Sequence, residues 1–314
     1  MKQNQIKPKA LKKGDVIGIV APASPPSSHE KIIRGAEYLE KIGYRVELGK
    51  NLFAKRGYLA GYDVARANDI NDFFGNKKIK AIFSLRGGYG TPRFLHLIDF
   101  NLIKNNPKIF VGYSDITALQ LAIFKKTRLV TFSGPMVGVE MWKEFNRFSE
   151  DFFWQMLTSK KKLGVAKLQN EVKLNFRTKG IAKGILLGGN LALMNSILGT
   201  PYSPNYKDSI LFFEEIEEAP YRFDRLLSQL NNSGALKNCA GVLIGELTNM
   251  KPTSDGPTLT IEEILKDYFK NKDFPVADGL PYGHIPRKIT MPIGINAEIN
   301  SETESLSFLE GCIE

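Results

Sequence analysis

Short apolar strands alternate with amphipathic helices through the first half of the chain, and this alternation constrains the fold more than any other feature. The strands are predicted near residues 16–20, 45–48, 81–85 and 108–111. The helices between the first three strands end at Gly43 and Gly75. Regular alternation of this kind predicts an α/β fold whose N-terminal domain is a doubly wound, flavodoxin-like parallel sheet.

The second half returns to an α/β pattern after a polar, lysine-rich interruption at residues 159–180. Its strands are predicted near residues 185–187, 210–213, 241–245, 289–293 and 305–309. One helix is expected to start at Asn190, and another carries apolar residues at helical spacing around Phe223. We therefore predict two domains, 1–162 and 163–314, with a functional site in the cleft between them, where ligand sites are common.

Ser114 lies on the turn that follows the strand near residues 108–111. Gly112 and Ser114 interrupt the apolar run, and a periodic apolar stretch starts at once with Ile116 and Leu119. A sharp strand-to-helix turn lifts a hydroxyl above the sheet edge and places backbone N–H groups beside it, as in a nucleophile elbow. Glycine is present on only one side of Ser114, so the segment alone also fits an ordinary capped helix start.

A glycine-rich loop, Arg86-Gly87-Gly88-Tyr89-Gly90, follows the strand near residues 81–85. Glycines let the backbone approach a ligand closely and direct N–H groups at it. Neither the Walker lysine nor a complete dinucleotide fingerprint accompanies the loop, which disfavours phosphate binding. A plain tight turn is the other interpretation.

The chain contains three histidines, and His284 has the most functional context. His29 lies near a helix start and His96 lies inside a helical stretch, whereas His284 follows a glycine in a loop. A serine and a histidine need an orienting carboxylate. Glu214 is the first carboxylate at the C-terminal end of the strand near residues 210–213, where α/β proteins bind ligands.

The acidic residues around Glu214 have a simpler interpretation as a solvated strand end and helix start. This interpretation suits Glu217 and Glu218, because negative charge is favoured before a helix N-terminus.

Several motifs, in one order along nearly the whole chain, resemble those of the LD-carboxypeptidase family, the murein tetrapeptide carboxypeptidases among the serine peptidases. The matching stretches are residues 13–24, 86–90, 112–115, 133–136, 188–191, 213–215, 220–222, 283–284 and 292–294. The resemblance implies a catalytic triad of Ser114, Glu214 and His284. It also implies an oxyanion hole built from the backbone amides of Gly88 and Asp115.

The resemblance further implies hydrolysis of the L,D-peptide bond that releases the terminal D-alanine from murein tetrapeptides in cell-wall recycling. Arg86, Gly87 and Tyr89 are expected to bind this peptide substrate, and the protein is expected to form a homodimer. The chain also resembles the microcin C self-immunity peptidases, which share the fold and triad but cleave an aminoacyl-nucleotide amide. Residues 198–201 and 220–225 are more similar to the murein enzymes. A non-catalytic binder of murein peptides is a third hypothesis, against which the complete triad argues.

Composition excludes several classes of protein. No apolar run approaches the ~20 residues of a membrane span. Two cysteines, Cys239 and Cys312, do not make a disulfide framework, which fits a reducing, cytoplasmic compartment. The N-terminal lysines and the apolar residues 16–21 imitate a secretory signal, but Gly14 and Asp15 break the transition between them, so we interpret the apolar stretch as a strand.

The net charge and the few possible metal ligands limit which partners and cofactors the protein can have. The net charge of +10 favours anionic partners, but the lysines are scattered and no nucleic-acid-binding motif is present. Three scattered histidines and two distant cysteines do not have the spacing of a zinc site, so we expect neither a metal nor a cofactor.

Overall fold

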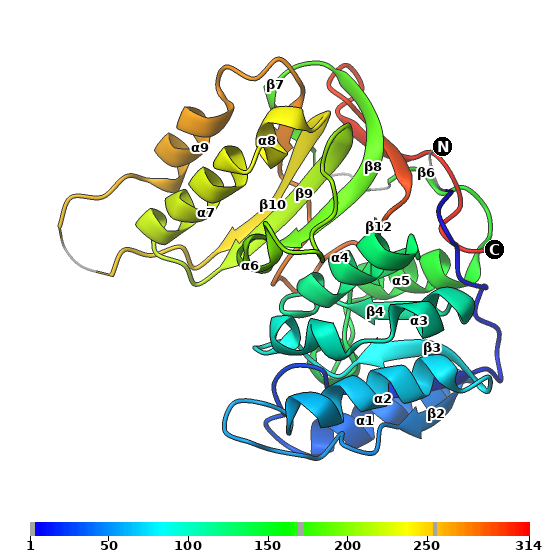
Figure 1. Ribbon diagram of the computed structural model, residues 1–314. Coiled ribbons are helices and arrows are strands. Elements are labelled where there is room, and N and C mark those ends of the chain that lie inside the picture. Colours follow the sequence, from blue (N-terminus) through cyan, green and yellow to red (C-terminus); the bar gives the residue numbers. More distant parts are fainter. Residues whose placement is uncertain (1–3, 167, 169–172, 254–255) are drawn as a thin grey trace.

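The computed structural model describes residues 4–166, 168, 173–253 and 256–314. Figure 1 shows two β-sheets with helices packed on them, the first half of the chain in blue to green and the second in green to red. The predicted α/β fold with two sheets is confirmed. Both ends of the chain lie on the same side of the molecule, where the Glu314 amide donates a hydrogen bond to the Pro8 carbonyl.

The first sheet has six strands within the described residues, in the order β12-β5-β4-β3-β1-β2. These strands are β1 Val16–Val20, β2 Arg45–Leu48, β3 Ile79–Ser84, β4 Ile109–Gly112, β5 Thr131–Ser133 and β12 Met291–Ile293. Strands β1 to β5 are parallel, and their order 2-1-3-4-5 is the flavodoxin-like one. The prediction for the N-terminal half is therefore confirmed.

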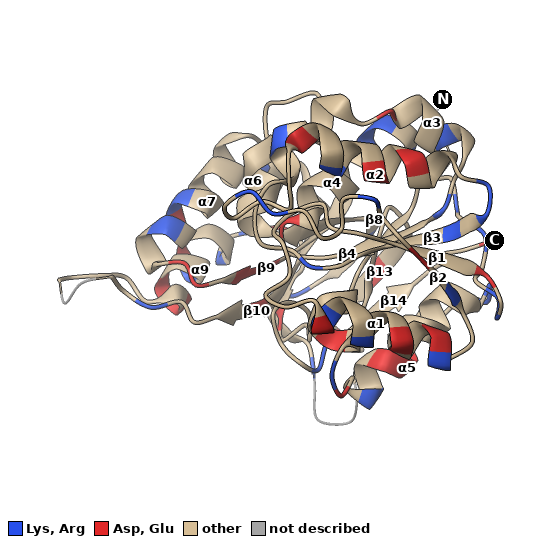
Figure 2. Ribbon diagram, turned by 90° about the horizontal axis from the view of Figure 1, so that it is seen from below, with Lys and Arg blue, Asp and Glu red and all other residues tan. Residues whose placement is uncertain are grey.

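Helices cover both faces of this sheet, as a doubly wound fold requires. They are α1 Glu30–Lys41, α2 Asp63–Gly75, η1 Thr91–Leu97, α3 Phe100–Asn105, α4 Ile116–Thr127, η2 Val137–Met141 and α5 Arg147–Thr158. Figure 2 shows α2, α3 and α4 on one face and α1 and α5 on the other. Helix α1 illustrates the local cause: Ile32, Gly35 and Leu39 recur at helical spacing and are buried, and Gly43, with φ 92°, makes the left-handed turn after its end.

The strand predicted near residues 289–293 belongs to the first sheet and not to the second. Strand β12 pairs antiparallel with β5, with Pro292 opposite Phe132. The prediction was wrong because β12 comes after strands of the second sheet along the chain but pairs with a strand of the first sheet. Strand β5 is the last of the parallel strands, and no parallel strand pairs with its outer edge. Strand β12 pairs with that edge instead.

The second sheet has eight strands within the described residues, in the order β6-β14-β13-β8-β9-β10-β11-β7. They are β6 Gly164–Val165, β7 Asn175–Thr178, β8 Ile181–Asn190, β9 Ser209–Ile216, β10 Gly241–Thr248, β11 Val276–Asp278, β13 Asn296–Asn300 and β14 Ser305–Phe308. Strands β8 to β11 are parallel, and the outer strands are antiparallel. The accompanying helices are α6 Leu191–Ile197, α7 Pro220–Asn232, α8 Ala235–Asn238 and α9 Ile261–Phe269.

Strand β9 spans Ser209–Ile216, so Glu214 and Glu215 both lie on it, near its C-terminal end. The polar segment 159–180 falls partly outside the described residues, and the domain boundary between residues 162 and 163 stays a prediction.

Helix α4 packs against strands of both sheets. It is buried along nearly its whole length, including polar Thr117 and Gln120. The Thr117 hydroxyl accepts a hydrogen bond of 3.0 Å from the Asn190 amide, at the end of β8. A Cβ on Gly189 would lie 2.4 Å from the Thr117 side chain, so glycine permits this close approach. The N-terminus of α4, where Ser114 lies, is thus held against the ends of β8 and β9.

Charged residues of both signs lie on the outer helices, for example α1 and α5 in Figure 2. No helix in the described part of the chain is both long and apolar enough to cross a membrane.

Candidate active site

Ser114 occupies a strained turn between β4 and α4. Its φ is 62°, a left-handed conformation that non-glycine residues adopt infrequently and that concentrates at functional sites. Gly112 makes the turn possible, because a Cβ there would lie 2.8 Å from the Ile116 side chain and 2.9 Å from the Ser84 hydroxyl. This is the geometry of a nucleophile elbow with only one of its usual glycines.

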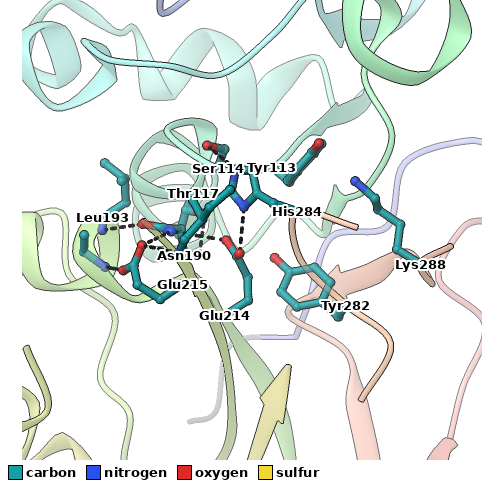
Figure 3. A network of polar contacts seen from close by, with 12 residues as sticks. Tyr113, Ser114, Thr117, Asn190, Leu193, Glu214, Glu215, Tyr282, His284 and Lys288 are labelled. Carbon is teal, nitrogen blue, oxygen red and sulfur yellow. Dashed lines mark hydrogen bonds and ion pairs between the residues drawn. The ribbon is translucent and has the colours of Figure 1, made fainter. Parts of the chain in front are cut away.

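His284 and Glu214 lie in line with Ser114 (Figure 3). The His284 Nε2 atom is 3.0 Å from the Ser114 hydroxyl oxygen, and its Nδ1 atom is 2.8 Å from Glu214 Oε2. An ionised carboxylate only accepts hydrogen bonds, so Nδ1 carries the proton and the lone pair of Nε2 faces the serine hydroxyl. The arrangement can therefore remove a proton from Ser114 and stabilise the resulting imidazolium.

Asn190 links two buried carboxylates behind this line (Figure 3). Its Nδ2 group donates hydrogen bonds of 3.2 Å to Glu214 Oε1 and 2.8 Å to Glu215 Oε1. Glu215 also accepts hydrogen bonds from the amides of Ala192 and Ile216, and it does not contact His284. Burial, above all, raises the pKa of Glu215 to about 7.

The sequence interpretation missed the part played by Asn190. Asn190 is the N-cap of α6, its side-chain oxygen accepts a hydrogen bond from the Leu193 amide, and it lies opposite Glu214 in the β8–β9 register. An asparagine at a strand-to-helix junction predicts the cap. The contact with Glu214 depends on strand register, which residues 188–191 alone do not reveal.

The Asp115 carboxylate ties the glycine-rich loop to the serine turn. It accepts hydrogen bonds of 2.9 and 2.8 Å from the amides of Gly90 and Thr91. The Ser24 hydroxyl accepts a third, of 3.1 Å, from the Tyr89 amide. These bonds fix the loop beside Ser114, so its backbone is already in place before a ligand binds.

Two backbone amides remain without protein acceptors at this junction. Among the hydrogen bonds of the described residues, neither the Gly88 nor the Asp115 N–H group donates to the protein. The loop passes close to the serine, because a Cβ on Gly87 would lie 3.0 Å from the Ser114 hydroxyl oxygen and 3.3 Å from the Asp115 nitrogen. Free N–H groups beside a nucleophile can stabilise a developing oxyanion.

A cavity of about 280 Å³ opens over Ser114 and His284. Three basic side chains line it, and no aspartate or glutamate is among its described lining residues. The full lining is Ser27, Lys31, Arg86, Gly87, Gly88, Tyr113, Ser114, Met136, Gly138, Val139, Trp142, Lys143 and His284.

Two of the three predicted substrate-binding residues line the cavity, and the third does not. Arg86 and Gly87 line the cavity, and the Arg86 guanidinium lies 3.3 and 3.4 Å from the carbonyls of Gly87 and Pro25. Tyr89 lies outside the lining, half exposed, with its ring 5.4 Å from that of Tyr58.

Metal ligands are not grouped anywhere in the described residues: no three His, Cys, Asp or Glu side chains could hold an ion together. Cys239 and Cys312 are both free and buried, and burial raises the pKa of each thiol to about 12.

Comparison with known proteins agrees with this geometry. The LD-carboxypeptidase N-terminal domain matches residues 17–134, and the LD-carboxypeptidase C-terminal domain matches residues 183–299. The chain belongs to the LD-carboxypeptidase family. Membership places it among serine-type carboxypeptidase hydrolases, as the sequence motifs predicted.

Three relatives cover almost the whole chain. The probable murein peptide carboxypeptidase of Bacillus subtilis (strain 168) is 38% identical over 98% of this chain and 96% of its own length. The crystal structure of the muramoyltetrapeptide carboxypeptidase from Oxalobacter formigenes is 30% identical, with a TM-score of 0.81 over 93% of this chain and 97% of that one.

The third relative is the microcin C7 self-immunity protein MccF of Escherichia coli, 28% identical over 95% of this chain and 94% of its length. A structure of MccF in complex with aspartyl sulfamoyl adenosine is 25% identical, with a TM-score of 0.90 over 98% of this chain and 100% of that one. These relatives are therefore named for two different roles, murein peptide carboxypeptidase and microcin C7 self-immunity.

Proposed function

We propose that the protein is a serine LD-carboxypeptidase that releases the terminal D-alanine from murein tetrapeptides in cell-wall recycling. The observation that carries the proposal is the line of Ser114, His284 and Glu214, with contacts of 3.0 and 2.8 Å, on a strained turn beside two free amides. The name of the Bacillus subtilis relative supports the choice of substrate.

In this mechanism Ser114 attacks the carbonyl carbon of the terminal peptide bond while His284 takes its proton. The carbonyl oxygen becomes an oxyanion, which the Gly88 and Asp115 amides stabilise; a comparable donor contributes about 2.7–4 kcal/mol in other sites. His284 then gives its proton to the leaving amine of D-alanine. Water, activated by the same histidine, releases the shortened peptide from the serine ester, and Glu214 keeps the imidazole oriented throughout.

The cavity supports a peptide end with a free carboxylate as the substrate. Lys31, Arg86 and Lys143 surround it with positive charge, and no acidic residue among its described lining residues opposes them. A terminal D-alanine carries its carboxylate one residue beyond the scissile bond, so a cation close to Ser114 would bind it. Positive charge there also favours carboxypeptidase action over cleavage inside a chain.

Cleavage of an aminoacyl-nucleotide amide is the second candidate, favoured by the close fit to the MccF complex. The residues at 198–201 and 220–225, which are more similar to those of the murein enzymes, favour the peptide substrate.

Purified protein incubated with a murein tetrapeptide and, separately, with an aminoacyl sulfamoyl adenosine tests the proposal by mass spectrometry. We expect a loss of one alanine from the tetrapeptide and no turnover of the adenosine, with Ser114→Ala as the inactive control. The opposite selectivity would establish the second candidate, and binding of the tetrapeptide without turnover would indicate a non-catalytic binder.

Two predictions accompany the proposal: the enzyme acts in the cytoplasm and it forms a homodimer. Light scattering during gel filtration measures the second, and a monomeric mass would contradict it.

A further inference from the structure

The segment that carries His284 is fastened to the first sheet and its helices, although Glu214 belongs to the second. The Tyr282 hydroxyl is 2.7 Å from the hydroxyl of Ser133, on β5. The Lys288 amide donates a hydrogen bond of 2.8 Å to the hydroxyl of Ser149, on α5. The segment then continues directly into β12 of the first sheet.

A buried ion pair completes this attachment. The Lys288 ammonium donates a hydrogen bond of 2.7 Å to Glu140 Oε1, and both side chains are almost fully buried, with 2% and 8% exposed. Glu140 lies on η2, a π-helical turn, and its other oxygen accepts a hydrogen bond of 2.8 Å from the Met136 amide. Met136 and the turn also line the cavity, and π-helical turns are frequent at functional sites.

Both members of the ion pair contact Tyr113, the residue before Ser114. The Tyr113 hydroxyl donates a hydrogen bond of 2.9 Å to Glu140 Oε1, and the Lys288 ammonium lies 3.9 Å from the centre of the Tyr113 ring. The His284 ring also lies beside the Tyr113 ring, with ring centres 5.1 Å apart (Figure 3). Tyr113 therefore contacts the serine turn by its backbone, the histidine by its ring and the ion pair by its hydroxyl.

Removing two charges from water is costly, and well-packed apolar residues would often stabilise a core equally well or better. A pair kept in this position therefore calls for a role beyond stability. We propose that Glu140 and Lys288 are positioning residues that hold the His284 segment against the Tyr113–Ser114 turn, and so maintain the 3.0 Å contact between base and nucleophile.

The physical reason lies in the different origins of the two groups. Ser114 is fixed by β4 and α4, whereas His284 stands on a loop that joins the two sheets. A loop tolerates shifts that a packed helix does not, and a displacement of about 1 Å between reacting groups can cost roughly 10²-fold in rate. The ion pair and Tyr113 give the loop a directional attachment that apolar contacts would not supply.

The test compares the wild type with the double variant Glu140→Met/Lys288→Met, which removes both charges together and also takes away the acceptor of the Tyr113 hydroxyl and the Met136 amide. The proposal rests on the proposed function, so the main readout avoids the natural substrate: a fluorophosphonate probe that phosphonylates an activated serine with loss of fluoride. We expect the double variant to remain folded by circular dichroism. Its maximal labelling rate at Ser114 should fall about 10²-fold, with the half-saturating probe concentration little changed.

Arg177→Met is the matched control. Arg177, on β7 of the second sheet, is partly buried and pairs with Asp278 on β11 and Glu262 on α9, away from the described cavity lining. We expect it to lower thermal stability and leave the labelling rate unchanged. A folded double variant that labels as fast as the wild type would overturn the proposal.

Two further measurements cover the remaining outcomes. If the double variant does not fold, Lys288→Met replaces it; this variant removes the attachment of the His284 segment while Glu140 keeps its hydrogen bonds from Tyr113 and the Met136 amide, and labelling equal to the wild type would again overturn the proposal. If the wild type itself is not labelled, the proposed function fails. Proton NMR of the His284 Nδ1–H signal then decides the positioning role, which requires a sharp signal in the wild type that is lost in the folded variant.

Discussion

Glu214→Gln exchanges one carboxylate oxygen for an NH₂ group with almost no change of shape. In the structure Glu214 Oε1 faces the Asn190 amide nitrogen at 3.2 Å, and Oε2 faces His284 Nδ1 at 2.8 Å. Asn190 cannot turn its oxygen toward position 214, because that oxygen already accepts a hydrogen bond from the Leu193 amide and its nitrogen also donates to Glu215. The new glutamine must therefore point its oxygen at Asn190 and its NH₂ group at His284.

This orientation reverses the tautomer of the histidine. Facing a donor, Nδ1 becomes an acceptor, and the ring proton moves to Nε2, opposite the Ser114 hydroxyl. The imidazole then has no lone pair with which to take the serine proton. The corresponding change in a serine protease costs about 10⁴ in kcat, and we expect a loss of the same order here, equivalent to about 5 kcal/mol in the barrier.

The assay is steady-state release of D-alanine from a murein tetrapeptide, with Glu215→Gln as the matched variant. Glu215 contacts Asn190 and two backbone amides but not the imidazole, so its substitution should cost far less in kcat. KM should change little in Glu214→Gln, because the substituted atoms do not line the cavity. A Glu214→Gln enzyme that keeps a tenth of wild-type kcat, or a larger loss in Glu215→Gln, would refute the reasoning.

Four other predictions follow from the same geometry. Ser114→Ala should keep the fold and lose activity by several orders of magnitude, and turnover above a tenth of wild type would remove this serine from the nucleophile's role. Gly87→Ala should fold but lose most activity, because the new Cβ would lie 3.0 Å from the Ser114 hydroxyl oxygen; unchanged kcat would show that the loop yields. Activity should survive exhaustive EDTA treatment, whereas loss restored by zinc would contradict a serine mechanism. Burial raises the pKa of Glu215 from 4.5 to about 7. Between pH 4.5 and about 7, Glu215 is therefore protonated in the folded protein and ionised in the unfolded chain. Stability should therefore fall as pH rises through this window and fall less in Glu215→Gln, as measured by thermal unfolding; parallel profiles would contradict the assignment.

Local patterns in the sequence determined much of the fold. Strands β1 to β4 and the helices between them follow from apolar periodicity and from glycines such as Gly43, which are properties of short segments. The Ser114 turn and the glycine-rich loop were predictable for the same reason: Gly112 and residues 86–90 leave room for backbone conformations that other residues resist.

Contacts between residues that are distant in the sequence could be identified only from the tertiary structure. The sequence motifs pointed to Glu214 and His284, 70 residues apart, but not to Asn190, Glu140 or Lys288, which support them. Asn190 reaches Glu214 because β8 and β9 pair in one particular register, and Lys288 reaches Glu140 because β12 crosses to the open edge of β5. Register and edge pairing depend on contacts between segments that are distant in the sequence. A short segment of sequence carries no information about which distant strand will satisfy its hydrogen bonds.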